Sequence, residues 1–280
     1  MLFRSWPLAY LVSVAGKFTH KGPAVPRMMT VSEINSEKKE FADACKRAVI
    51  AGYDCLEIHA CHGYLLYEFL SPILNKRTDQ YGGSLDNRAR IILEFAESAL
   101  DAVKDAIPVG IRMSAAEHMP GGFTLEDVVY VAKKLQDLGI AYFHLSDGPG
   151  LSIYMEPDSD EHVNDHLLKE AKAFKKALKI PIITPSVHIP SVCEQVIADG
   201  TTDMISHGRQ ALADPDWPNK VKEGKLSDIR KCLRDNMCFT TLGINCRCTL
   251  NTQLGFEQYD PDLFPKKRGE IVPPALQKLR

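Results

Sequence analysis

Two histidines and a tyrosine stand close together in the segment EIHACHGYLL, as His59, His62 and Tyr64. Neighbouring imidazoles can donate hydrogen bonds to a carbonyl oxygen that gains negative charge, and a phenol beside them can give a proton to carbon. An isolated histidine is more often a core residue, but three such side chains after one apolar run favour a reaction site. Zinc is the competing interpretation, because histidine is a common ligand. No third ligand is evident at a fitting spacing.

The eight cysteines are distributed unevenly along the chain. Four of them crowd one short polar segment, which suggests a metal or iron–sulfur site: Cys232, Cys238, Cys246 and Cys248. The other four are scattered, as is typical of reduced thiols in a cytoplasmic protein. We therefore expect a cytoplasmic location.

The elements that position these residues alternate between short apolar runs and amphipathic helices. Capping boxes mark two helix starts, Thr30 with Glu33 and Thr124 with Asp127. Further helices are expected near 91–103 and 167–178. Strands are expected over 55–58, 109–113, 142–146, 180–184 and 203–206. Strands that alternate with helices pair in parallel through right-handed crossovers.

Polar or small residues stand at the carboxyl end of each expected strand: His59, Arg112, Ser146, Thr184 and Gly208. A (β/α)₈ barrel gathers its site from several strand ends on one face. A doubly wound dinucleotide-binding fold instead has one glycine-rich turn, and GxGxxG does not occur in the sequence. The pattern therefore favours an α/β fold of the (β/α)₈ TIM type over residues 1–222. An irregular, cysteine-bearing extension is expected over 223–280.

The segment 57–90 resembles the signature of the old yellow enzyme family of flavin-dependent ene-reductases. It is most similar to the branch of 2,4-dienoyl-CoA and 2-enoate reductases. The matching motifs are EIH at 57–59, HGYLL at 62–66, FLSP at 69–72, NKRTDQYGGS at 75–84 and NR at 87–88. The similarity extends from about Pro26 to Gly269, through PRMMT at 26–30, VGIRMS at 109–114 and SHGR at 206–209.

This resemblance implies FMN as cofactor and NAD(P)H as co-substrate. The implied cofactor-binding residues are Arg112, Thr184, Gly208 and Arg209. Arg112 would face negative charge on the reduced flavin, and Gly208 and Arg209 would bind the phosphate. His59 and His62 would hold the carbonyl oxygen of a small unsaturated carbonyl or acyl-CoA substrate, and Tyr64 would protonate its α-carbon. The alternative is an impaired flavin-barrel remnant, or a subunit that needs a partner chain.

Two features depart from the family pattern. Only 56 residues precede Glu57, so the first two barrel strands are expected to be missing, with 11–18 as an altered third strand. Open sheet edges of this kind favour a partner chain or a homo-oligomer. In the cysteine segment, Cys232, Cys238 and Cys248 match three ligands of the family's iron–sulfur branch. Those three match the first, third and fourth ligands, Asp235 stands at the second ligand position, and Cys246 lies nearby. A 4Fe–4S cluster, reduced thiols of a lost site and a zinc site all remain open.

Charge and hydropathy exclude other classes of protein. The net charge of −2 gives no reason to expect nucleic acid or an anionic membrane as partner. The sequence contains no apolar run near the roughly 20 residues that span a bilayer. The apolar stretch 6–16 loosely resembles a signal peptide, but Pro7 interrupts it and a buried strand explains the same residues.

Overall fold

The computed structural model describes residues 27–148, 167–235, 238 and 248–251. The described residues belong to two compact units, and the chain passes from the first to the second between His207 and Gly208. The strand expected at 11–18 lies outside the described residues, as do Cys246 and most of the expected extension.

The first unit contains a parallel sheet of five strands in sequence order. These are β1 (Leu56–Ala60), β2 (Val109–Ser114), β3 (Phe143–Ser146), β4 (Ile182–Pro185) and β5 (Met204–Ser206). A doubly wound sheet would reverse its strand order at a switch point, whereas this order continues in one direction, as in TIM-type barrels. The five expected strands are all present, and their bounds agree with the expected ones to within two residues at each end.

Closure into a barrel is not seen among the described residues. The sheet that they form is open, with β1 and β5 at its edges. Eight strands with matched tilt and shear are needed to close a barrel of this type, and the described ranges supply five. The expectation of a parallel α/β sheet is thus confirmed, while the closed barrel stays a prediction.

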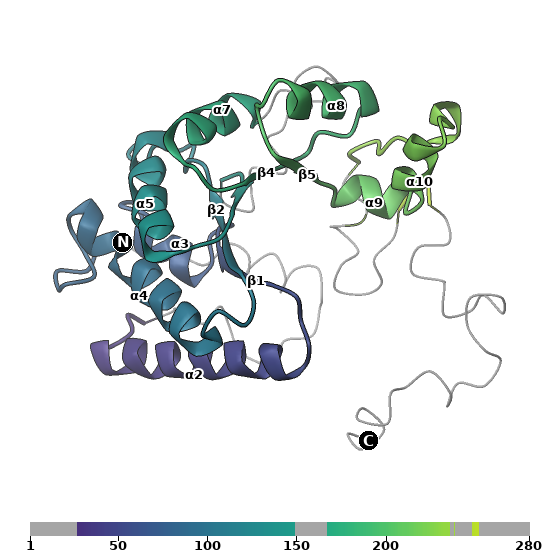
Figure 1. Ribbon diagram of the computed structural model, residues 1–280. Helices are drawn as coiled ribbons and strands as arrows, with labels where there is room; N and C mark the ends of the chain where they lie inside the picture. Colours follow the sequence, from purple (N-terminus) through teal and green to yellow (C-terminus); the bar gives the residue numbers. More distant parts are fainter. Residues whose placement is uncertain (1–26, 149–166, 236–237, 239–247, 252–280) are drawn as a thin grey trace, which may run out of the picture. The chain divides into compact units, whose positions relative to one another are not determined.

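A row of helices lies beside the sheet (Figure 1). α2 (Val31–Ile50) contacts α4 (Leu85–Val103), α4 contacts α5 (Leu125–Leu138), and α5 contacts α7 (Leu168–Ala177). The shorter α3 (Leu65–Leu70) follows β1, and α8 (Pro190–Ala198) follows β4. Within the described ranges, every helix is too short or too polar to cross a membrane.

Both predicted capping boxes are present. The Thr30 hydroxyl accepts a hydrogen bond from the Glu33 amide at 3.2 Å, and the Glu33 carboxylate accepts one from the Thr30 amide at 2.8 Å. The same reciprocal pair starts α5. Helix α4 begins six residues before the expected start at 91, because the Ser84 side chain caps it by accepting from the Asn87 amide.

The core lies between the sheet and the helices. Strand register aligns apolar side chains across the sheet: Ile58, Ile111, Phe143 and Ile182. All four are buried, and the Phe143 ring stacks on that of Phe174 from α7 with centroids 4.8 Å apart. Fully burying such a side chain stabilises the fold by about 1.5–3 kcal/mol. Because successive strand residues point to opposite faces, the residues between them form a second, polar face.

The second unit is more ordered than the sequence predicts beyond Pro215. It contains α9 (Arg209–Ala213), α10 (Trp217–Lys222) and the short 3₁₀ helix Leu226–Asp228. The Asp214 carboxylate, fully buried, accepts hydrogen bonds from the Lys220 ammonium at 2.7 and 3.0 Å and from the Arg230 amide at 2.9 Å. A buried charge needs such partners. These hydrogen bonds hold α10 and the segment up to Arg230 against Asp214.

Candidate active site

A row of polar side chains crosses three strands on the polar face of the sheet. Register places His59 of β1 beside Arg112 of β2, and Arg112 beside His144 of β3. The Nε atom of Arg112 is buried and has no hydrogen-bond partner among the described residues. A buried donor left in this way is costly, so the guanidinium is suited to an anionic group that comes from outside the described chain.

The turn after β1 brings His62 back beside His59. His62 has a left-handed backbone with φ 63°, and Gly63 follows with φ 79°. This conformation costs a non-glycine residue on the order of 1–3 kcal/mol and is often found at functional sites. The ring centroids of His59 and His62 are 5.0 Å apart, and Tyr64 lies 5.6 Å from His59. The structure therefore places the three side chains together, while their catalytic role stays a prediction.

The phenol of Tyr64 is accessible to a ligand. The residue is 53% exposed and stands at the N-cap of α3, where its side chain makes no capping hydrogen bond. His62 is held more firmly, because a hydrogen bond of 2.6 Å joins its Nε2 to the Ser146 hydroxyl oxygen at the end of β3. The site thus combines a fixed imidazole with an open phenol.

The surroundings of both histidines favour the neutral imidazole. Burial, followed by the positive charge of Arg112, lowers the pKa of His62 to about 4. The same two causes, in the same order, lower the pKa of His59. A neutral imidazole still carries one N–H group. Each ring can therefore donate a hydrogen bond to an oxygen without giving up its proton.

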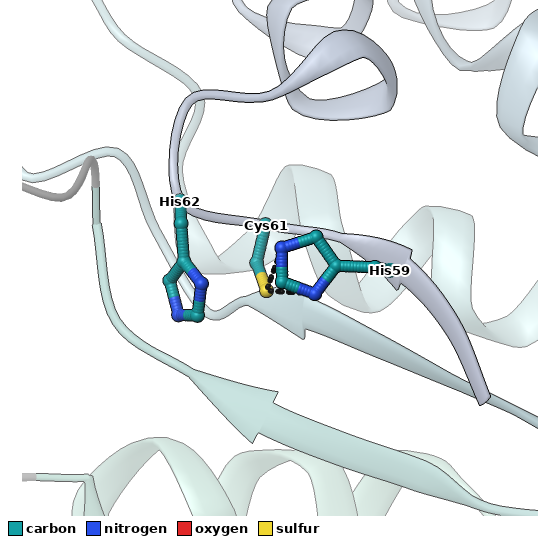
Figure 2. A group of neighbouring side chains, drawn as sticks. All are labelled: His59, Cys61 and His62. Atoms are coloured by element: carbon teal, nitrogen blue, oxygen red, sulfur yellow. Dashed lines mark hydrogen bonds between the residues drawn. The ribbon is translucent and has the colours of Figure 1, made fainter. Parts of the chain in front are cut away.

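Cys61 is a member of this site that the sequence analysis missed. Its side chain is fully buried, and its sulfur lies 3.7 Å from both ring nitrogens of His59. In Figure 2 the sulfur stands between the two imidazoles. Burial raises the pKa of the thiol to about 12, which keeps it protonated. The pattern HxCH at 59–62 was the available signal, and it places three ligand atoms within 4.8 Å of one another.

A second hydrogen-bonded chain crosses the same face and was also missed. His144 Nδ1 lies 2.8 Å from the Glu57 carboxylate, and His144 Nε2 lies 2.8 Å from the Ser206 hydroxyl. Burial pushes the pKa of Glu57 upward, but the hydrogen bond and charge of His144 outweigh it, so the pKa is lowered. The two hydrogen bonds of His144 therefore connect β1, β3 and β5.

The remaining predicted cofactor-binding residues have ordinary structural surroundings in the described ranges. The hydroxyl of Thr184 is buried and donates to that of Thr202 at 2.9 Å. Gly208 and Arg209 belong to the second unit, where Gly208 is the N-cap of α9. A Cβ atom added to Gly208 would meet nothing within 4 Å, so the described chain itself does not require a glycine there. Their roles toward a cofactor stay predictions.

The predicted metal ligands of the second unit do not converge on one ion in the described part of the chain. The Arg234 amide donates to the sulfur of Cys232 at 3.4 Å, and the Thr249 hydroxyl donates to the Asp235 carboxylate. Cys238, Cys248 and these residues form no group of three ligand atoms close enough to share an ion. Cys246 lies outside the described residues.

Comparison with known proteins decides the family. The model of the NADH:flavin oxidoreductase / NADH oxidase family matches residues 11–228. The chain belongs to this family. Its members, which include old yellow enzyme-like proteins, are NAD(P)H-dependent oxidoreductases that use FMN, so the resemblance seen in the sequence is confirmed.

Individual relatives agree with the family assignment. An NADH oxidase of Thermoanaerobacter brockii is 38% identical over 256 residues, which is 88% of this chain and 39% of that protein. An NADPH dehydrogenase of Geobacillus thermodenitrificans strain NG80-2 is 33% identical over 205 residues, 72% of this chain and 57% of that one. This chain therefore spans less than two thirds of the length of these relatives.

Solved structures show the same fold. The complex of 2-naphthoyl-CoA reductase with 2-naphthoyl-CoA superposes with a TM-score of 0.80 at 32% identity, over 87% of this chain and 37% of that one. A morphinone reductase variant in complex with tetrahydroNAD superposes with a TM-score of 0.61 at 28% identity, over 76% and 54%. Such neighbours are TIM-barrel flavoenzymes.

Proposed function

We propose that this chain is an FMN-dependent ene-reductase that passes hydride from NAD(P)H, through the flavin, to an α,β-unsaturated carbonyl or an enoyl or dienoyl substrate. The observation that carries the proposal is the group at the end of β1. Two imidazoles and an exposed phenol stand together there, and Arg112, whose Nε is buried, lies beside His59 in the strand register.

The residues of the polar face fit FMN. The buried Nε of Arg112 finds no partner in the described chain, and a flavin ring that carries negative charge would supply one. We assign the ring contact to Arg112. The family resemblance implies a further contact from Thr184 and phosphate contacts from Gly208 and Arg209, since glycine permits close approach and arginine binds bidentately. When bound, FMN supplies the redox centre that accepts and donates the hydride.

The chain's own side chains would then handle the substrate oxygen and the proton. His59 and His62 donate N–H hydrogen bonds to the carbonyl oxygen, which stabilises the charge that develops on it. Tyr64 gives its phenolic proton to the α-carbon as the β-carbon receives hydride, so the C=C bond becomes CH–CH and NAD(P)⁺ is left. Solvent returns the proton to Tyr64. Because both imidazoles are neutral, they bind the oxygen without competing as acids.

The relatives support the substrate class, and the free thiols support the cellular location. A reductase of 2-naphthoyl-CoA and a morphinone reductase are among the structural neighbours, which supports a small conjugated carbonyl or acyl-CoA substrate here. We place the reaction in the cytoplasm because Cys45, Cys55, Cys61 and Cys193 are free thiols, as is usual in a reducing compartment. The open edges of the described sheet support a partner chain or a second copy.

The cysteine segment of the second unit does not fit a complete cluster with the donors described. Four thiolates are the usual ligand set, whereas the described donors are three thiols and the Asp235 carboxylate, which already accepts a hydrogen bond from Thr249. An iron–sulfur cluster therefore stays a prediction, and the reaction above does not depend on it.

An absorption spectrum and a turnover assay test the proposal. The full chain, purified without oxygen and supplied with FMN, should retain flavin absorbance. It should consume NADH or NADPH only when 2-cyclohexenone is present, with cyclohexanone as the product. A colourless protein that takes up no FMN would instead support the flavin-barrel remnant or the subunit of a larger assembly.

A further inference from the structure

We propose that His59, Cys61 and His62 form a binding site for a soft divalent cation such as Zn²⁺. One thiolate and two imidazoles would be the protein ligands, and a water molecule would occupy the fourth position. Three protein ligands with one open position are the arrangement of many exchangeable zinc sites.

The distances already approach those of a zinc site. One ligand atom from each residue lies within 4.8 Å of the other two, and the Cys61 sulfur is 3.7 Å from the ring nitrogens of His59. With Zn–S near 2.3 Å and Zn–N near 2.0–2.1 Å, a tetrahedral ion separates sulfur from nitrogen by about 3.6 Å. Because the Cys61 sulfur is equally far from both nitrogens of His59, it faces the ring and not one lone pair (Figure 2). The His59 ring must therefore rotate about its side-chain bonds to bring one nitrogen to an ion shared with Cys61 and His62.

The surrounding structure holds the ligands in place. Cys61 is fully buried directly after β1, and the left-handed turn at His62 fixes where its ring begins. The Ser146 hydroxyl bonds Nε2 of that ring, which leaves Nδ1 for the ion. A partner on the second ring nitrogen is the usual outer contact of a zinc-bound histidine. Less ordering entropy is therefore lost on binding than at a flexible surface site.

The chemistry of the donors and the local charge select the ion. Binding breaks the S–H bond of Cys61, forms a metal–sulfur bond and releases one proton to solvent, while each imidazole contributes a lone pair. The thiolate offsets part of the ion's charge, which matters because Arg112 lies beside His59 in the strand register. Sulfur and imidazole ligands favour Zn²⁺, Co²⁺ or Cd²⁺ over Mg²⁺ and Ca²⁺, which prefer oxygen.

Binding has a consequence for catalysis, and only this consequence rests on the proposed function. The same two imidazoles would hold the substrate carbonyl oxygen, and an ion between them occupies that place. We therefore expect Zn²⁺ to compete with the carbonyl substrate and with phenolate ligands that mimic its enolate.

Metal titration of the full chain tests the site. The four cysteines of the second unit are changed first, because they could bind zinc themselves: Cys232→Ser, Cys238→Ser, Cys246→Ser and Cys248→Ser. In this background, equilibrium dialysis should find one Zn²⁺ per chain. Co²⁺ should give a thiolate-to-metal absorption band, and X-ray absorption should show one sulfur neighbour at about 2.3 Å. Mg²⁺ should not compete.

Single substitutions then identify the ligands. Cys61→Ala should weaken Zn²⁺ binding more than about 100-fold and abolish the cobalt–thiolate band, since loss of an outer contact alone costs 10- to 100-fold. Cys193→Ala removes another buried thiol and should change neither the Zn²⁺ affinity nor the cobalt–thiolate band. Circular dichroism checks folding, and His62→Asn supplies an independent ligand loss if Cys61→Ala does not fold. Unchanged affinity in the folded ligand variants, or an ion with two or more sulfur neighbours, would overturn the site.

A phenolate competition separates this site from the proposed function. If Zn²⁺ binds but does not displace 4-hydroxybenzaldehyde from the FMN-loaded chain, the metal site stands and the assigned oxyanion role fails. If the phenolate binds at His59 and His62 and Zn²⁺ does not bind at all, the metal site is wrong and the proposed function is untouched.

Discussion

His62 shows how one residue can serve the whole site. Its left-handed backbone turns the chain at the end of β1, and its ring is bonded to Ser146 of β3. Burial and Arg112 keep that ring neutral. Strain in the backbone, a hydrogen bond across strands and a lowered pKa therefore all act on the same side chain. That convergence is expected where a group must be held ready for a ligand.

Replacing Tyr64 by phenylalanine tests the proton donor. Tyr64→Phe should slow reduction of the unsaturated substrate by about 10²- to 10⁴-fold, the usual contribution of a general acid. Flavin reduction by NAD(P)H should keep its rate, because that step needs no proton from this phenol. Anaerobic stopped-flow measurement of the two half-reactions distinguishes them. Tyr53→Phe, an exposed tyrosine outside the site, is the control, and equal losses in both half-reactions would contradict the assignment.

At the scale of elements, polar contacts between strands supplement the apolar core. The Glu57–His144–Ser206 chain joins β1, β3 and β5 on the polar face, while the helices pack on the other. Such contacts fix the relative positions of strand ends. The site at the end of β1 depends on them, because Arg112 comes from β2 and Ser146 from β3.

The charge on Glu57 should make stability depend on pH. Its pKa is lower in the folded chain than in the unfolded one, so the ionised carboxylate stabilises the fold above its ordinary pKa of about 4.5. That contribution is lost as the pH falls through the folded pKa. Glu57→Gln should therefore cost about 1 kcal/mol at neutral pH and less in acid. Urea unfolding at several pH values measures this, and a pH-independent difference would argue against the linkage.

The cap of α5 is a second test at this scale. Thr124→Ala removes the hydroxyl that accepts from the Asp127 amide at 3.3 Å and should lower the free energy of unfolding by about 1 kcal/mol. Thr124→Ser keeps the hydroxyl and should retain most of the stability. Chemical denaturation of both variants gives the comparison. An equal loss in the two would mean that packing of the threonine methyl, and not the cap, is responsible.

The sequence predicted these elements well because their signals are local. Capping boxes span four residues, and apolar runs mark strands directly, so the five strands and the starts of α2 and α5 agree with the structure. Contacts between residues far apart in the sequence were harder to predict. The Glu57–His144 bond joins residues 87 positions apart, and a sequence pattern does not show which strand faces which. Cys61 was overlooked because an apolar thiol after a strand ordinarily belongs to the core.

At the scale of the whole molecule, the family and the strand order agree. Five parallel strands in sequence order and the similarity to TIM-barrel flavoenzymes both indicate a singly wound α/β fold. Closure of the barrel is a property of the first and last strands together, so local patterns could not establish it. The proposed reaction combines contributions from several strands, and binding of FMN with a substrate analogue reports on all of them at once.

Titration of the FMN-loaded chain with 4-hydroxybenzaldehyde tests the central claim most directly. A phenolate held by His59 and His62 over the flavin should give a long-wavelength charge-transfer band. His59→Ala and His62→Ala should each weaken this binding by about 2–4 kcal/mol, or about 30- to 1000-fold, because each removes one preorganised hydrogen-bond donor. A chain that binds no FMN, or variants that both bind the phenolate as tightly as the parent chain, would contradict the account.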